Sequence, residues 1–132
     1  MHEDKVLDFT TEKKAWREVK TQEKFLNAFR GLKVFWMTTS NLLTHTGVAF
    51  VVIVLGFYFK ISGIEWIALV FAIGFVIIAE AFNTAIEIDI DLTSPEYHPY
   101  ARDTKDVAAA AVLLSVFVSV IVGVIIFLPK IF

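Results

Sequence analysis

The last quarter of the chain holds an uninterrupted apolar run that limits what the sequence can fold into. Val107 to Leu128 is 22 residues long and contains no charged residue. As a helix, a run of that length spans a hydrocarbon core about 30 Å thick. Hydrophobic residues make up 57% of the sequence and the mean hydropathy is +0.68, well above the usual values for a soluble domain. The sequence therefore predicts an all-α integral membrane protein.

Two further apolar segments precede this run, so three membrane-spanning helices are predicted. The first is apolar only over 47–59, and it reaches spanning length only if the polar residues from Asn41 onward are included. The second begins near Ile64 and must run through the acidic residues from Glu80 onward to cross the membrane. The predicted spans lie at about 42–60, 64–90 and 105–128.

All three prolines of the chain lie near the predicted ends of the last two spans. Residues 92–104 contain Ser94-Pro95 and His98-Pro99, and a residue that precedes proline avoids helical geometry. We therefore expect a loop over 92–104. Pro129 is expected to end the third helix, because proline lacks the N–H group that a helix interior needs.

The N-terminal part of the chain is polar and divides at about residue 20. Residues 1–20 form a mixed-charge arm without the apolar segment of a signal peptide, so no cleavage is expected, and residues 21–132 form the membrane domain. Residues 22–36 have an amphipathic helical pattern, in which basic residues oppose apolar ones. This pattern fits equally a helix lying in the membrane interface and an ordinary helix docked on protein. The apolar face contains Phe25, Phe29, Leu32 and Trp36.

The distribution of basic residues predicts the orientation in the membrane. Eight of the twelve lysines and arginines lie in the first 33 positions, and Arg102 and Lys105 lie near the second predicted loop. Lys60 and Lys130 stand alone at the opposite side. By the positive-inside rule, the N-terminus and the second loop face the cytoplasm. The chain has no cysteine, which excludes disulfides and thiolate metal sites.

The second predicted span ends in a stripe of polar side chains. Glu80, Asn83, Glu87 and Asp91 are three, four and four residues apart, which places them on one face of a helix. Carboxylates at membrane depth are costly and usually functional. The alternative is that they are merely solvated at the membrane boundary. That alternative is weakest for Glu80, which continues the apolar run that begins at Trp66.

These side chains have the chemistry that phosphoryl transfer requires. One carboxylate of the Glu80–Glu87 pair can bind a hard cation and the other can act as a general base, while Asn83 orients either one. Lysine supplies a positive charge for phosphate. A zinc site is not expected, since the chain has no cysteine and no second histidine near His98. The polar groups able to hold a nucleotide are Glu96, Tyr97, His98, Lys105 and Asp106.

Three separated pieces of the sequence resemble, in order and spacing, the small prokaryotic membrane diacylglycerol kinase family, which also contains undecaprenol kinases. They are Phe-Arg-Gly-Leu-Lys from Phe29, Glu-Ala-Phe-Asn-Thr-Ala-Ile-Glu-Ile-Asp-Ile-Asp from Glu80, and Glu-Tyr-His from Glu96 with Lys-Asp-Val-Ala-Ala from Lys105. The resemblance covers roughly residues 25–128. It implies a homotrimer of three-span protomers in the prokaryotic cell membrane. It also implies an interfacial helix and cytoplasmic active sites shared between subunits.

The resemblance further implies an activity and a role for each site residue. The activity is transfer of phosphate from ATP, with Mg²⁺, to a membrane lipid alcohol, either diacylglycerol or undecaprenol. The Asn-Thr-Ala sequence within the acidic segment slightly favours the undecaprenol kinase branch of the family. Glu80 would be the base and Glu87 the metal ligand, with Asn83 and Asp91 in support. The nucleotide contacts would be Glu87, Glu96, Tyr97, His98, Lys105 and Asp106, and the lipid and interface contacts would be Arg30, Lys33 and Trp36.

One position departs from the family pattern. Members usually carry a glutamate, a second carboxylate for the metal, at the position that matches Thr39, and a hydroxyl is a weaker and neutral ligand. Either Glu87 and the ATP phosphates suffice, or an acid from the N-terminal arm substitutes. Two alternatives to an active enzyme follow: a non-catalytic relative that binds nucleotide or lipid, and a small membrane scaffold. The scaffold hypothesis does not explain why Glu80, Asn83 and Glu87 align.

Overall fold

The computed structural model describes residues 21–132, and this part of the chain is entirely helical. The arm predicted at 1–20 lies outside the described residues. The chain forms two units, one up to Met37 and the other from Thr38 to the C-terminus, and each is described by itself. The all-α prediction is confirmed. The helices are α2 (Thr21–Thr38), α3 (Leu42–Tyr58), α4 (Gly63–Thr93) and α5 (Pro99–Ile131).

Helix α2 contains the predicted amphipathic segment. Its apolar side chains are exposed: Phe25, Leu26 and Phe29 each keep about two thirds of their surface accessible. Arg30 and Lys33 are exposed as well. A helix with an apolar face and a basic face, both of them exposed, is suited to a membrane surface.

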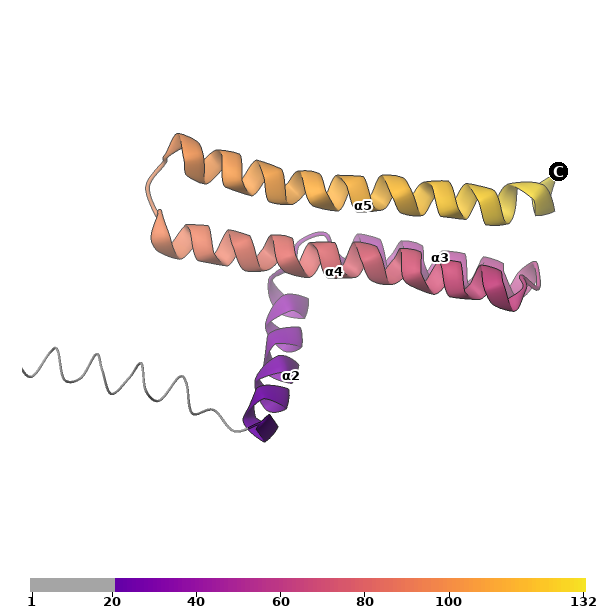
Figure 1. Ribbon diagram of the computed structural model, residues 1–132, viewed down its shortest axis with the longest axis horizontal. Coiled ribbons are helices and arrows are strands. Elements are labelled where there is room, and N and C mark those ends of the chain that lie inside the picture. Colours follow the sequence, from indigo (N-terminus) through magenta and orange to yellow (C-terminus); the bar gives the residue numbers. More distant parts are fainter. Residues whose placement is uncertain (1–20) are drawn as a thin grey trace, which may run out of the picture. The chain divides into compact units, whose positions relative to one another are not determined.

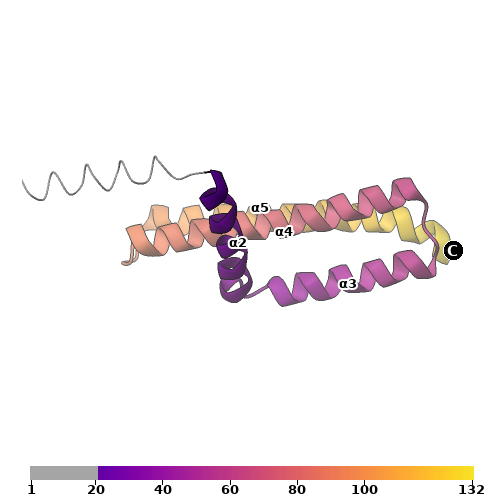
Figure 2. The ribbon, with the colours of Figure 1, turned by 90° about the horizontal axis from the view of Figure 1, so that it is seen from below.

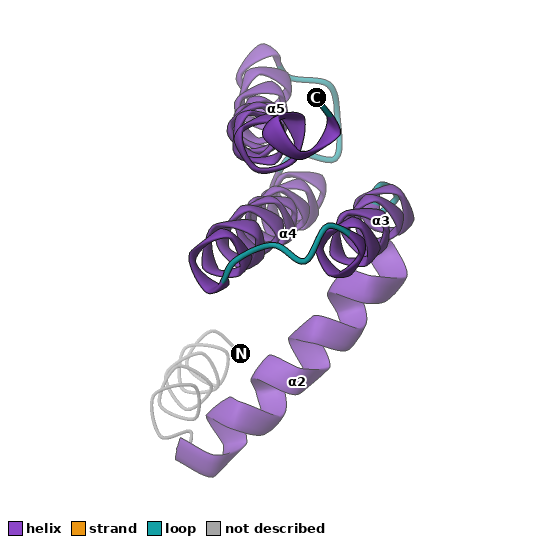
Figure 3. Ribbon diagram, turned by 90° about the vertical axis from the view of Figure 1, so that its right-hand side faces the viewer, coloured by secondary structure: helices purple, strands orange, loops and turns teal. Residues whose placement is uncertain are grey.

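Helices α3, α4 and α5 run antiparallel to their sequence neighbours and form a three-helix unit (Figures 1 and 3). Helix α4 packs on both of the others, and more extensively on α5 than on α3. The turn between α3 and α4 lies at the opposite end of the unit from the loop between α4 and α5 (Figure 2). This arrangement separates the acidic second half of α4 from the turn between α3 and α4.

Within residues 21–132, two helices are long and apolar enough to cross a membrane. They are α4 and α5, with mean hydropathies of 2.2 and 3.1 over their most apolar windows, and α2 and α3 taken together would raise the number of spans to three. Helix α3 has 17 residues, which is about 25 Å of helix and shorter than a full hydrocarbon core. Large apolar side chains cover the outside of α3, α4 and α5, as expected for a surface that contacts lipid or other membrane helices.

The α3–α4 turn is fixed by a small apolar cluster and by polar caps. Ile61, Leu69, Ile126 and Phe127 are the buried residues of that cluster. Ser62 caps α4: its hydroxyl accepts from the N–H of Glu65 at 3.3 Å, and the Glu65 carboxylate accepts from the N–H of Ser62 at 2.7 Å. This reciprocal pair is a capping box. Glu65 also pairs with Lys130 of α5 at 2.8 Å, so the end of α5 is tied to the start of α4.

Two predicted boundaries in the last part of the chain are wrong. The loop expected over 92–104 is confined to 94–98, because α4 continues to Thr93 and α5 begins at Pro99. Proline is well suited to the first position of a helix, where its missing N–H costs nothing, and His98 caps that helix by accepting from the N–H of Tyr100 at 3.2 Å. Pro129 does not end the third helix. It sits in the last turn, where few helical bonds remain to be lost, and the helix runs to Ile131.

Candidate active site

The predicted stripe lies along the second half of α4, and burial changes sharply along it. Glu80 is 2% exposed, Asn83 is half-buried, and Glu87 and Asp91 are exposed. Measured along the helix axis from Gly63, Glu80 lies at about 25 Å and Asp91 at about 42 Å. If a hydrocarbon core about 30 Å thick begins at Gly63, Glu80 lies inside it and Asp91 lies beyond it. The stripe therefore runs from a buried carboxylate to a solvated one.

Glu80 is hydrogen-bonded to a histidine that the sequence interpretation did not assign to the site. Nε2 of His45, near the start of α3, lies 2.9 Å from Oε1 of Glu80. The two side chains keep 20% and 3% of their surface accessible. The signal that could have found His45 is its place inside a predicted span, where an ionisable side chain usually has a polar partner.

Thr39 also contacts α4, but through a hydroxyl. Its Oγ1 lies 2.8 Å from Oγ1 of Thr84, a buried residue one turn after Glu80. The position where the sequence resemblance implies a carboxylate is thus occupied by a neutral side chain bonded to another neutral side chain. Thr84 was also missed as a site neighbour, because nothing in the sequence pairs it with Thr39.

Asn83 and Glu87 form a local pair on the stripe. Nδ2 of Asn83 donates to Oε1 of Glu87 at 3.0 Å. Oδ1 of Asn83 is buried and has no hydrogen-bond partner among the described residues. An amide oxygen without a partner beside a carboxylate suits a hard cation such as Mg²⁺, which takes oxygen ligands. Within residues 21–132, however, no three His, Cys, Asp or Glu side chains gather into a ready metal site.

Whereas Arg30, Lys33 and Trp36 lie on α2, Asp91 and the predicted nucleotide contacts other than Glu87 meet at the loop between α4 and α5. There they line a pocket of about 290 Å³. Lys105 of α5 forms an ion pair with Asp91 of α4 across this pocket, and Arg102 contacts the hydroxyl of Tyr97 at 3.4 Å. The pocket lies at the solvated end of the stripe and is rich in polar groups. The predicted site residues that line it are Asp91, Glu96, Tyr97, His98, Lys105 and Asp106.

These features define a helical membrane protein with a buried carboxylate, Glu80, in the middle of α4 and a polar pocket at the α4–α5 loop. The family model for prokaryotic diacylglycerol kinase matches residues 26–127. The chain therefore belongs to the prokaryotic diacylglycerol kinase family, and it is a multi-pass membrane lipid kinase. This match confirms the family and the enzyme class that the sequence motifs indicated.

Individual relatives agree with this assignment. The chain is 39% identical over 108 residues to an undecaprenol kinase of Bacillus subtilis, covering 82% of this chain and 88% of that protein. It is 36% identical over 106 residues to a diacylglycerol kinase of Synechocystis, covering 80% of this chain and 61% of that protein. It is 28% identical over 94 residues to a diacylglycerol kinase of Escherichia coli K12, covering 71% of this chain and 77% of that protein. The relatives that match most of the chain thus include an undecaprenol kinase and two diacylglycerol kinases.

Proposed function

We propose that this chain transfers the terminal phosphate of ATP to the hydroxyl group of undecaprenol, with diacylglycerol as the second candidate substrate. The observation that carries the proposal is the buried carboxylate of Glu80, which lies on the same face of α4 as Asn83 and Glu87. The preference for undecaprenol rests on the 39% identity to a protein of that activity and on the Asn-Thr-Ala of the acidic segment.

Glu80 acts as the general base in this proposal. The lipid hydroxyl would lie at the membrane boundary beside Glu80, which removes its proton as the hydroxyl oxygen bonds to the terminal phosphorus. The bond between that phosphorus and the bridging oxygen breaks, and ADP leaves. Direct in-line transfer fits the site, since none of its described residues is arranged as a covalent acceptor.

Glu87 and Asn83 are the residues that would hold Mg²⁺. The support is the exposed Glu87 carboxylate together with the buried, unpartnered Oδ1 of Asn83. When bound, the metal would neutralise charge on the phosphate oxygens of ATP. Two oxygen ligands suffice only if phosphate and water complete the coordination, which is the usual arrangement for magnesium.

The pocket at the α4–α5 loop would hold the nucleotide. Lys105 is its most useful cation, because an ammonium group compensates phosphate charge as the terminal phosphate moves. In the structure Lys105 pairs with Asp91, so ATP would take over this lysine from a solvated carboxylate at little cost. Asp91 and Glu80 are about 16 Å apart along the helix. An ATP molecule with its adenine in the pocket could therefore extend its triphosphate along α4 toward Glu80.

Topology and assembly are part of the proposal. The N-terminus and the α4–α5 loop would face the cytoplasm, supported by the basic residues of the first 33 positions and by Arg102 and Lys105. Helix α2 would lie in the interface, with Arg30, Lys33 and Trp36 near lipid headgroups. A homotrimer of three-span protomers is supported by the family resemblance and by the apolar surface of α3 to α5.

The test is a transfer assay in detergent micelles. Purified protein receives labelled ATP and magnesium with undecaprenol or with diacylglycerol, and the lipid fraction is examined for label. Wild type should label undecaprenol, and Glu80→Gln should reduce transfer by about 10²–10⁴-fold. Glu23→Gln, an exposed glutamate on α2, is the matched control and should behave as wild type. Nucleotide binding without transfer to either lipid would instead favour the non-catalytic relative that Thr39 suggests.

A further inference from the structure

The hydrogen bond between His45 and Glu80 joins two helices at the proposed base. A carboxylate that is almost fully buried is stable only with a strong hydrogen-bond partner. The partner that the structure gives Glu80 is His45, whose Nε2 lies 2.9 Å from Oε1. The bond crosses from the first turn of α3 to the middle of α4, 35 positions apart in sequence. It is therefore a tertiary contact rather than a local helix pair.

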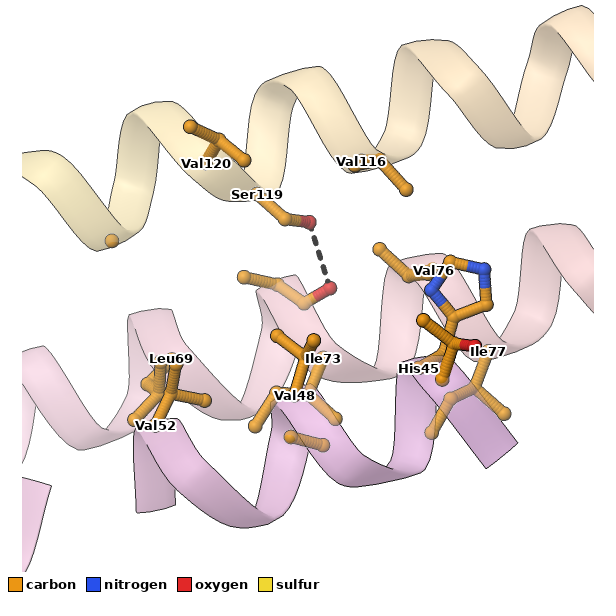
Figure 4. A pocket seen from close by; sticks show the side chains of 14 residues that line it. His45, Val48, Val52, Leu69, Ile73, Val76, Ile77, Val116, Ser119 and Val120 are labelled. Carbon is orange, nitrogen blue, oxygen red and sulfur yellow. Dashed lines mark hydrogen bonds between the residues drawn. The ribbon is translucent and has the colours of Figure 1, made fainter. Parts of the chain in front are cut away.

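Two features hold the His45 ring in place. The first is the Thr39–Thr84 hydrogen bond, which fastens the chain just before α3 to α4 one turn after Glu80. The second is an apolar cavity of about 320 Å³ between α3, α4 and α5. The His45 ring lines this cavity beside Val76 and Ile77 (Figure 4). The ring thus lies between the apolar side chains of this cavity and the carboxylate of Glu80. A ring confined in this way can fix the orientation of a carboxylate.

We infer that His45 is a positioning residue for the phosphoryl transfer, an inference that rests on the proposed function. The neutral ring donates its Nε2–H to Oε1 of Glu80. This bond turns the other oxygen, Oε2, toward the lipid hydroxyl. In the reaction the O–H bond of the lipid breaks and a bond from Oε2 to the proton forms. After transfer Glu80 releases that proton to solvent, while His45 keeps its own proton throughout.

The closest alternative is that His45 only stabilises the fold. A fold contact would affect the amount of active enzyme, whereas a positioning contact affects the turnover of each folded molecule. Glutamine separates the two hypotheses, because its side-chain nitrogen can stand where Nε2 of histidine stands. Asparagine is one carbon shorter and cannot reach Glu80 from the same backbone position.

The experiment compares His45→Leu, His45→Gln and His45→Asn with wild type in the micelle assay. Rates are normalised to folded protein, measured by thermal unfolding in the same detergent. His45→Leu and His45→Asn should lower kcat by about 10- to 100-fold, as expected for a displaced catalytic group, and leave the KM values for lipid and ATP unchanged. His45→Gln should restore most of kcat. Thr44→Val, the neighbouring lining residue of the cavity, is the control and should match wild type.

A second comparison tests whether His45 acts through Glu80. In the Glu80→Gln background, adding His45→Leu should cause no further loss, because residues that act as a unit are not additive. The inference is overturned if folded His45→Leu and His45→Asn keep wild-type kcat, if only KM changes, or if folded His45→Gln is as slow as His45→Leu. Should His45→Leu fail to fold, the Gln–Asn comparison decides the question. Failure of the proposed function is distinct, since wild type itself would then label neither lipid.

Discussion

Thr39→Glu tests most directly the proposal that Glu87 and Asn83 hold Mg²⁺. Thr39 bonds to Thr84 at 2.8 Å, and Thr84 lies one helical turn before Glu87, about 4.5 Å along the axis. A glutamate side chain extends about two bonds beyond the threonine hydroxyl. A carboxylate at this position would therefore reach the space beside Asn83 and Glu87, where the metal is proposed to bind.

The expected gain follows from ligand charge. A third oxygen ligand that carries a full negative charge should lower the half-saturating magnesium concentration by about 10- to 100-fold, equivalent to about 1.4–2.7 kcal/mol. The gain is limited because the new carboxylate loses part of its hydration and lies near the buried charge of Glu80. Thr39→Gln, which has the same length and no charge, is the matched control.

The assay titrates magnesium at constant ATP in micelles and follows lipid phosphorylation, while paramagnetic resonance of Mn²⁺ measures metal binding directly. Thr39→Glu should shift both curves to lower metal concentration, and Thr39→Gln should leave them in place. The reasoning fails if the two variants shift the curves equally, because charge would then be irrelevant. It also fails if neither variant moves them, since Glu87, Asn83 and the ATP phosphates would then suffice.

Two further predictions concern the proposed nucleotide pocket and the fold. Lys105→Met should raise the KM for ATP and lower transfer by at least tenfold, about 1.4 kcal/mol, whereas Lys130→Met, at the opposite end of α5, should leave the KM for ATP unchanged. Gly56→Ala should lower the melting temperature in detergent, because its Cβ would lie 2.8 Å from Cη2 of Trp66. Overpacking costs about 1–3 kcal/mol, more than the roughly 1 kcal/mol that alanine gains in a helix. Gly47→Ala, with open space before its Cβ, should not destabilise; a lower melting temperature for both variants would contradict the packing argument.

Local patterns were sufficient for the class of fold and for the candidate residues on α4. Apolar runs of spanning length and the three- and four-residue spacing from Glu80 to Asp91 depend only on residues close in sequence. Those features predicted a helical membrane protein with a polar stripe. The helix ends were less accurate, because Pro99 begins α5 and Pro129 is tolerated in its last turn. Proline indicates a helix boundary without indicating on which side of it the helix lies.

The partners of the stripe were decided only by tertiary structure. Whether His45 meets Glu80, and whether Thr39 meets Thr84, depends on how α3 is rotated and shifted against α4 across 35 and 45 positions of sequence. A rotation of one residue about the α3 axis would turn each side chain by about 100° and replace both contacts. The sequence by itself thus determined which carboxylate is costly to bury. Helix packing decided that His45 forms a hydrogen bond to this carboxylate and that Thr39 bonds to another hydroxyl, that of Thr84.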